Sequence, residues 1–152
     1  MKRWLLIPCA LLGGILLWQV CRGLFITDEK LVRNLITTMQ HAVERNKILA
    51  LNDCIAADYT DEHSLDKSSL LGAIRGVRSQ YDIMLIRLSD LKLEVNAPDK
   101  TAQAAFTVNV VAHRAGGGGE TTMDADRVRL FFRKTDDGWK LSRAEYPEMD
   151  FK

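Results

Sequence analysis

The sequence predicts an α+β domain in which three N-terminal helices pack on a curved four-stranded antiparallel sheet, preceded by one transmembrane helix. Between about residues 28 and 81, apolar residues recur every three or four positions, as on one side of a helix. From Ile83 onward they recur every second position, as in strands. One long apolar run lies before both regions. Helices followed by strands are typical of a sheet that helices cover on one face.

Length and composition allow one modest folded domain. The chain has 152 residues, of which 47% are hydrophobic and 27% charged, as in ordinary globular proteins. Its 21 Lys and Arg nearly balance its 20 Asp and Glu, for a net charge of +1. The local basic cluster, Arg127, Arg129, Arg133 and Lys134, fits a solvated sheet face better than a phosphate-binding surface. We therefore expect no nucleic-acid partner.

The N-terminal apolar run predicts a membrane anchor. Lys2 and Arg3 precede residues 4–21, WLLIPCALLGGILLWQVC, which as a helix would cover about 27 Å, enough for a hydrocarbon core. A cleaved signal peptide is the alternative, but the run has neither an A-x-A pattern nor a lipoprotein cleavage box. We expect residues 1–26 to be a signal anchor and linker, with the folded domain on the exported side, periplasmic or extracellular.

The folded domain is expected over residues 27–147, followed by a tail over 148–152. Thr27 and two acids predict the start of a helix with an apolar stripe, formed by Leu31, Leu35, Ile36, Met39 and Val43. A shorter helix is predicted from about Lys47 to Ala57, then a polar loop over residues 58–64. Asp66 or Ser68 can cap a third helix, which carries Leu70, Leu71, Ile74, Val77 and Tyr81.

Four strands are predicted after the helices. The first runs from Ile83 to Val95, and a change of phase at Ser89-Asp90 indicates a bulge. The second, Thr101–Arg114, has the most regular alternation and is expected to lie centrally, with an inner face of Ala, Phe and Val. The glycines of residues 115–119 predict a flexible connection, and Asp136-Asp137-Gly138 predicts the hairpin into the last strand.

Three segments resemble the nuclear transport factor 2-like superfamily, in particular its SnoaL-like and DUF4440-type bacterial members. They are LITTMQHAVERNKILALNDCIAADYTDE, SDLKLEVNAPDKTAQAAFTVNV and RVRLFFRKTDDGWKLSRAEY. The resemblance spans about Asp28 to Tyr146 and depends on the order and spacing of the segments. It implies a cone-shaped, cystatin-like domain with a pocket between sheet and helices, and often dimerisation through the sheet. It does not imply one activity, because this fold hosts isomerases, hydrolases, dehydratases and non-catalytic binding proteins.

Candidate pocket residues follow from this resemblance and from the inward strand positions. The loop residues are Tyr59, Asp61 and His63, and the others are Tyr81, Phe106, Val108, Leu130 and Trp139. An isomerase-like reaction would need a desolvated carboxylate and hydroxyl donors, roles open to Asp58 or Asp61 with Tyr59 and Tyr81. Alternatively, the acids cap helix ends and Tyr59 packs against the sheet. The inner strand face has no ionisable residue, so we expect a non-catalytic domain.

No metal or cofactor is expected. His41, His63 and His113 fall on a helix, a loop and a strand, without the spacing of a metal site. Cys9 and Cys21 belong to the apolar run, so Cys54 has no partner for an internal disulfide and is expected to be a buried apolar residue.

The outer face of the central strand is the candidate interface, formed by Gln103, Thr107, Asn109, Val111 and His113. We expect a membrane-anchored, exported module that binds a protein partner or forms a homodimer through this face. In layout the chain is similar to secretion-system scaffold components that carry a periplasmic domain of this fold. The first alternative is a pocket for a small apolar ligand, and the second is a SnoaL-like or ketosteroid-isomerase-like enzyme.

Overall fold

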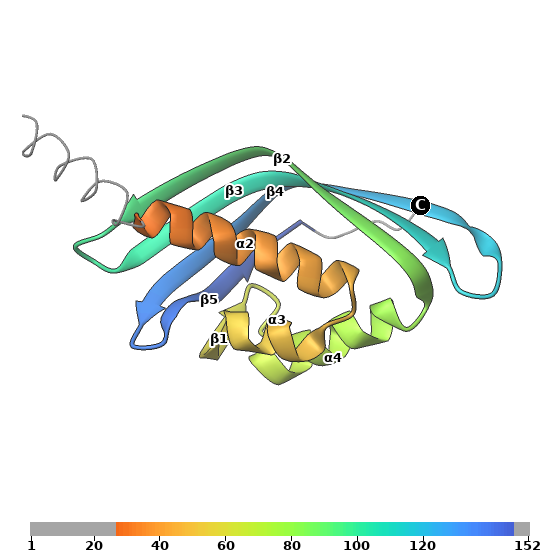
Figure 1. The fold of residues 1–152 in the computed structure, drawn as a ribbon, viewed down its shortest axis with the longest axis horizontal. Helices are drawn as coiled ribbons and strands as arrows, with labels where there is room; N and C mark the ends of the chain where they lie inside the picture. Colours follow the sequence, from red (N-terminus) through yellow and green to blue (C-terminus); the bar gives the residue numbers. More distant parts are fainter. Residues whose placement is uncertain (1–26, 148–152) are drawn as a thin grey trace, which may run out of the picture.

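The computed structural model describes residues 27–147, which form three helices on one mixed sheet of five strands (Figure 1). The helices are α2 (Asp28–Glu44), α3 (Ile48–Cys54) and α4 (Lys67–Arg78). The strands are β1 (Ile55–Asp61), β2 (Tyr81–Asn96), β3 (Thr101–Arg114), β4 (Gly118–Thr135) and β5 (Gly138–Glu145), in the spatial order β1-β5-β4-β3-β2. The predicted α+β class is confirmed.

Several sequence predictions concern residues outside this range. The expected anchor over residues 4–21, its linker and the tail over 148–152 all lie outside the described residues. Within residues 27–147, no helix combines the length and the apolar character that crossing a membrane requires.

The prediction of four antiparallel strands is wrong, because residues 55–61 form a fifth strand, β1. We predicted a helix end and a polar loop there. Instead β1 pairs in parallel with β5, with Ile55 opposite Leu141 and Asp61 opposite Ala144. The segment IAADYTD mixes strand-forming residues with two alanines and two aspartates, and its partner strand β5 lies far away in the sequence. Tertiary pairing therefore decides its conformation, against its local propensity.

Two helix starts follow the predicted capping chemistry. The side chain of Thr27 accepts a hydrogen bond from the backbone N–H of Lys30, and Asp66 accepts one from Ser69. Each contact satisfies a backbone donor that the first turn of a helix leaves free. The apolar stripes of α2 and α4 face the inner surface of the sheet and pack in the core there.

A buried arginine connects the C-terminal end of α4 to the C-terminal end of α2. Arg78, the last residue of α4, is 8% exposed and donates hydrogen bonds to the carbonyl oxygens of Val43 (3.0 Å) and Glu44 (3.3 Å). Both carbonyls belong to the last turn of α2, where helical N–H donors run out, and the Val43 carbonyl also accepts from the backbone N–H of Asn46 at 3.1 Å. The guanidinium thus holds the two helices in a fixed relation above the sheet.

The strands bend where the sequence predicted an irregularity. The pairing of β2 with β3 shifts between Ser89 and Lys92, and Asp90 has a left-handed φ of 55°. This confirms the bulge. The predicted connection of residues 115–119 is partly wrong, since its last two residues, Gly118 and Gly119, already belong to β4.

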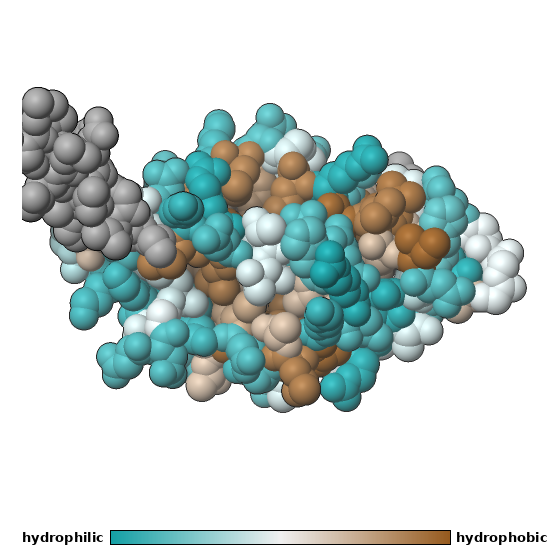
Figure 2. Space-filling model, in the orientation of Figure 1, coloured by the Kyte–Doolittle hydropathy of each residue, from teal (hydrophilic) through white to brown (hydrophobic). Residues whose placement is uncertain are grey.

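The core lies between the inner face of the sheet and the helices. Val32 of α2 and Phe132 of β4 are 0% and 1% exposed, and Leu51 of α3 is also fully buried. A second, smaller cluster consists of Met84, Val110 and Ala112. On the molecular face that α2 crosses, hydrophobic residues show only as separate patches among hydrophilic ones (Figure 2).

Candidate functional site

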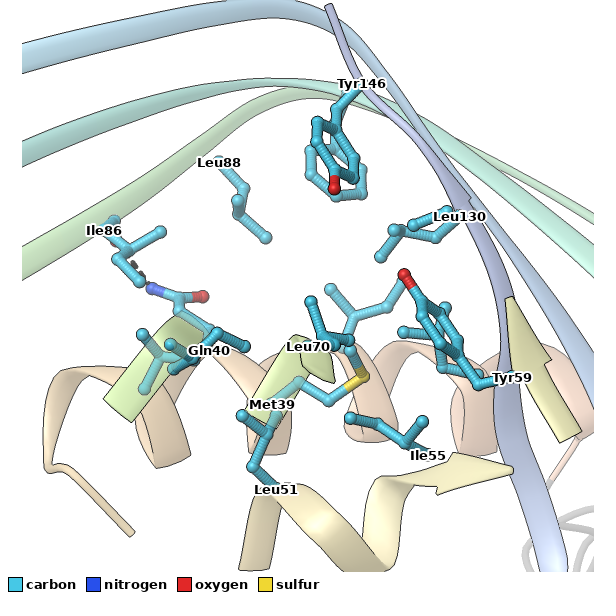
Figure 3. Close-up of a pocket in the computed structure, with 16 residues that line it drawn as sticks. Met39, Gln40, Leu51, Ile55, Tyr59, Leu70, Ile86, Leu88, Leu130 and Tyr146 are labelled. Atoms are coloured by element: carbon cyan, nitrogen blue, oxygen red, sulfur yellow. Dashed lines mark hydrogen bonds between the residues drawn. The ribbon is translucent and has the colours of Figure 1, made fainter. Parts of the chain in front are cut away.

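A cavity of about 220 Å³ lies between the helices and the inner face of the sheet (Figure 3). Side chains of α2, α3 and α4 form one side, among them Met39, Leu51 and Ile74. The other side is formed by the strands, with Ile86, Leu88, Phe106, Leu130, Leu141 and Ala144. Among the described residues that line it, the polar side chains are Gln40, Tyr59 and Tyr146, and none is ionised at neutral pH. The cavity is therefore an apolar site with a few hydrogen-bonding groups.

Tyr59 provides the first of these groups. It comes from β1, is 3% exposed and lines the cavity, and its hydroxyl oxygen is itself buried (Figure 3). No described residue forms a hydrogen bond with this buried hydroxyl. Burial raises the pKa of Tyr59 above its ordinary value, and the nearby Asp61 carboxylate adds to the shift. The hydroxyl therefore remains protonated at neutral pH and can donate a hydrogen bond.

Tyr146 is the second tyrosine of the cavity, and its hydroxyl is already bonded. It donates to Oδ2 of Asp61 at 2.8 Å, while Oδ1 of Asp61 accepts from the backbone N–H groups of His63 and Leu65 at 2.9 and 2.8 Å. Burial and this hydrogen bond raise the pKa of Tyr146 to about 12. Asp61 is 6% exposed, but its carboxylate has three donors, which is the satisfied state that burial of a charge requires.

Gln40 and Glu44 of α2 bond the backbone of the edge strand β2. Gln40 Nε2 donates to the carbonyl oxygen of Ile86 at 2.7 Å, and Glu44 Oε1 accepts from the N–H of the same residue at 2.9 Å. Figure 3 shows the amide oxygen of Gln40 turned toward the cavity. These contacts connect α2 to β2 and hold one side of the cavity in place.

The structure brings together some of the candidate pocket residues and separates others. Tyr59, Phe106 and Leu130 line the cavity. Asp61 and His63 lie behind it, around Tyr146, with the His63 ring 5.1 Å from the Tyr146 ring. The other three lie outside the lining: Tyr81, Val108 and Trp139. Trp139 is buried in the core, where its indole N–H donates to Asp28 at 3.1 Å.

We expected a non-catalytic domain because the inner face of the central strand has no ionisable residue. Asp61, one of the two acids that we considered as a base, is nevertheless buried close to the cavity, because residues 55–61 form the strand β1. Asp58, the other acid considered, is exposed and pairs with Arg133 at 2.6 Å. Sequence reasoning also missed Tyr146 and Gln40; the first follows the last strand and the second interrupts an apolar helix stripe, and neither position suggested a cavity.

The candidate interface residues all lie on the outer face of β3, alternating with its buried residues. Two of them form cross-strand pairs: Asn109 donates to Asp124 at 2.6 Å, and His113 lies 3.2 Å from Glu120. Val111 lies opposite Leu85 of β2, which is 50% exposed.

Residues 27–147 contain no cluster of three or more His, Cys, Asp or Glu side chains that could hold a metal ion. Cys54 is buried, its thiol donates to the carbonyl oxygen of Ala50 at 3.2 Å, and burial raises its pKa. A raised pKa disfavours the thiolate and with it nucleophilic chemistry.

No family model matches this chain, and no curated protein matches it. Several solved structures match it. A candidate dehydratase of the nuclear transport factor 2-like family from Streptomyces avermitilis is 23% identical, with a TM-score of 0.68 over 79% of this chain and 94% of that one. A conserved protein from Planctomyces limnophilus is 15% identical, with a TM-score of 0.71 over 82% and 98%.

A candidate scytalone dehydratase from Novosphingobium aromaticivorans is 10% identical, with a TM-score of 0.69 over 80% of this chain and 83% of that one. At such identities the likeness shows the fold alone. The described domain has the nuclear transport factor 2-like fold, as the sequence predicted for this part of the chain.

Proposed function

We propose that this domain binds a small apolar ligand in the cavity between its helices and its sheet, without a chemical reaction. The observation that carries the proposal is the cavity of about 220 Å³, lined almost wholly by hydrocarbon side chains and three uncharged polar ones. Concave, mainly apolar pockets with a few convergent polar groups are the usual form of small-molecule sites. The core around it is otherwise closely packed, with Val32 and Phe132 fully buried.

The charged groups near the cavity support binding over catalysis. Both oxygens of Asp61 are engaged, by Tyr146 and by two backbone N–H groups, and Glu44 is engaged by Ile86. Asp61 also does not line the cavity, whereas a general base must lie within hydrogen-bond reach of the substrate proton. Two comparison structures are named as dehydratases, so an enzyme remains the alternative; it predicts that Asp61→Asn abolishes turnover while the protein still folds.

A substitution that fills the cavity tests the proposal. Ile74 of α4 lines it, whereas Val77 lies on the same helix outside the lining. Ile74→Phe is expected to weaken binding of an apolar probe such as indane at least tenfold in isothermal titration calorimetry, and Val77→Phe to leave it unchanged. Equal affinities for the two variants would contradict the proposal. Native mass spectrometry of protein purified from its own cells should also detect a bound small molecule.

A second candidate function is self-association through the outer face of the sheet. Ile83 and Leu85 of β2 are 53% and 50% exposed, and Leu85 lies opposite Val111 of β3. Neighbouring exposed apolar side chains on a sheet face are a common feature of interfaces. Val111→Asp is expected to shift a dimer to a monomer in sedimentation velocity, while Leu49→Asp, at an 82% exposed position on α3, should not. A profile that Val111→Asp leaves unchanged would argue against this interface.

We also propose that the domain is anchored to a membrane and exported. The apolar run over residues 4–21 supports a single-pass protein with its folded domain on the exported side, where it would meet a ligand or a protein partner. Carbonate extraction of cell membranes tests this, because an anchored chain stays in the pellet. Release of the full-length chain into the supernatant would contradict the anchor.

A further inference from the structure

Strand β2 forms one edge of the described sheet, with β3 on one side and no strand on the other (Figure 1). At Ile86 the free side is occupied, because Gln40 donates to its carbonyl oxygen and Glu44 accepts from its N–H. Both backbone groups of Ile86 therefore point away from β3. In an antiparallel pair every second residue points this way, so the free side of β2 presents a row of such groups. An edge of this kind is a template on which another strand can pair.

The row continues beyond the bulge of β2. The extra residue of the bulge belongs to β2, and on β3 an even number of positions separates the partners of Leu93 and Val95 from the partner of Ile86. Leu93 and Val95 therefore point away from β3 as Ile86 does. Within residues 27–147, no hydrogen bond from outside the sheet reaches the backbone of either residue. Their side chains and that of Leu91 pack against the core but are only half-buried. Residues 91–95 thus form an open edge.

The charged side chains of the open edge favour one partner strand, a second copy of β2. Lys92 and Glu94 are exposed and lie two residues apart on the outer face. If two copies pair in antiparallel fashion about a two-fold axis at Leu93, each Lys92 lies opposite Glu94 of the second copy. An axis at position 92 or 94 instead places two lysines or two glutamates opposite each other. Unlike charges directly opposite each other stabilise a sheet and like charges destabilise it, so the axis at Leu93 is favoured.

The same register suits the backbone and the apolar side chains. Leu93 lies on the axis, where the two copies can exchange both of their N–H···O=C hydrogen bonds. Val95 of each copy lies opposite Leu91 of the other, so half-buried apolar side chains cover each other. The contacts of α2 with Ile86 do not obstruct the pairing, because Ile86 would lie opposite residue 100 of the second copy, beyond the end of β2.

We propose that this protein forms a homodimer in which the open edges of two copies pair in antiparallel fashion about Leu93, so that two five-stranded sheets become one continuous sheet. The two copies contribute the same residues, as in any dimer with two-fold symmetry. The dimer does not depend on the ligand-binding function, and its contact surface differs from the outer face around Val111.

Reversal of the two charges tests the inference in the full chain. Sedimentation velocity over a range of protein concentrations, in a density-matched detergent, measures the dissociation constant of the dimer. Lys92→Glu or Glu94→Lys alone turns both attractive pairs into repulsive ones and should raise this constant about tenfold. The double variant restores unlike pairs in the reverse order and should return the constant to near the wild-type value. Arg75→Glu, the same change of charge at an exposed position of α4, should have no effect.

Recovery in the double variant is the decisive result, because two independent losses of stability would add and not cancel. A wild-type chain that stays monomeric at every concentration would overturn the inference, and so would single reversals that leave the dimer unchanged. A double variant as weak as either single one would also overturn it, since Lys92 and Glu94 would then not face each other across the dimer. If only Val111→Asp dissociates the dimer, the copies associate through the outer face and the edge pairing is wrong.

Discussion

The hydroxyl of Tyr146 donates a hydrogen bond of 2.8 Å to Oδ2 of Asp61, and so joins the residue after the last strand to the end of the first strand. The bond has a charged acceptor and is partly buried, which makes it stronger than most hydrogen bonds in the domain. It also turns the Tyr146 ring toward the cavity, where the ring forms part of the lining.

Tyr146→Phe is therefore expected to lower the free energy of unfolding by about 1 to 2 kcal/mol, since it removes a hydrogen bond to a charged group. A double-mutant cycle with Asp61→Ala, followed by urea denaturation, measures the pairwise contribution. We expect a coupling energy of about 1 kcal/mol. Tyr81→Phe serves as the control and should add to Asp61→Ala without coupling, because Tyr81 does not contact Asp61. Additive effects of Tyr146→Phe and Asp61→Ala would contradict the contact.

Tyr59→Phe is expected to have the opposite effect and to stabilise the protein by about 0.5 to 1.5 kcal/mol, since it removes a buried hydroxyl without a protein partner. Urea denaturation in ligand-free buffer measures the change, and the slope of the transition should stay the same. A loss of stability would mean that the hydroxyl is already satisfied in the folded protein.

Stability should decrease in alkaline solution. Burial raises the pKa of Tyr146 to about 12, and it also raises the pKa of Tyr59. In the unfolded state tyrosine titrates near pH 10, so the folded state binds both protons more tightly. Their contribution is complete below about pH 10 and is lost as the pH rises through 12. Urea denaturation at pH 9, 10 and 11 should show the decline, and a Tyr59→Phe/Tyr146→Phe double variant should show a shallower one. Parallel curves for the two proteins would rule out this cause.

Lys100 offers a test of backbone strain in the turn between β2 and β3. Its φ is 55°, in the left-handed region that glycine adopts without steric cost. Lys100→Gly is expected to raise the free energy of unfolding by about 0.5 to 1 kcal/mol. Glu94→Gly, at a regularly paired position of β2 opposite Gln103, should lower it by a similar amount. If both substitutions destabilise the protein equally, the turn is not strained at Lys100.

The sequence was most informative where local chemistry decides the structure. Thr27 and Asp66 are good helix caps, and the alternation of Thr101–Arg114 predicted the whole of β3 with its inner and outer faces. The bulge at Ser89-Asp90 appeared as a change of phase because a one-residue shift reverses the direction of every later side chain. Each of these signals is contained within a few residues.

The candidate site was harder to predict because long-range pairing creates it. Residues 55–61 contain two alanines and two aspartates, poor strand formers that adopt a strand by pairing with β5. Tyr59 was a candidate, but the orientation of its hydroxyl depends on that strand. Tyr146 and Gln40 come from opposite ends of the domain, and no spacing in the sequence relates them.

The parallel pairing of β1 with β5 also affects how the protein matures during synthesis. Leu141, Ala144 and Tyr146 all line the cavity, yet they leave the ribosome after every helix and four of the five strands of the domain. A nascent chain that ends within β4 has no partner for β1 and leaves the apolar stripes of the helices partly uncovered. We therefore expect chaperones to bind such truncated nascent chains. We also expect aggregation when translation stalls before β5.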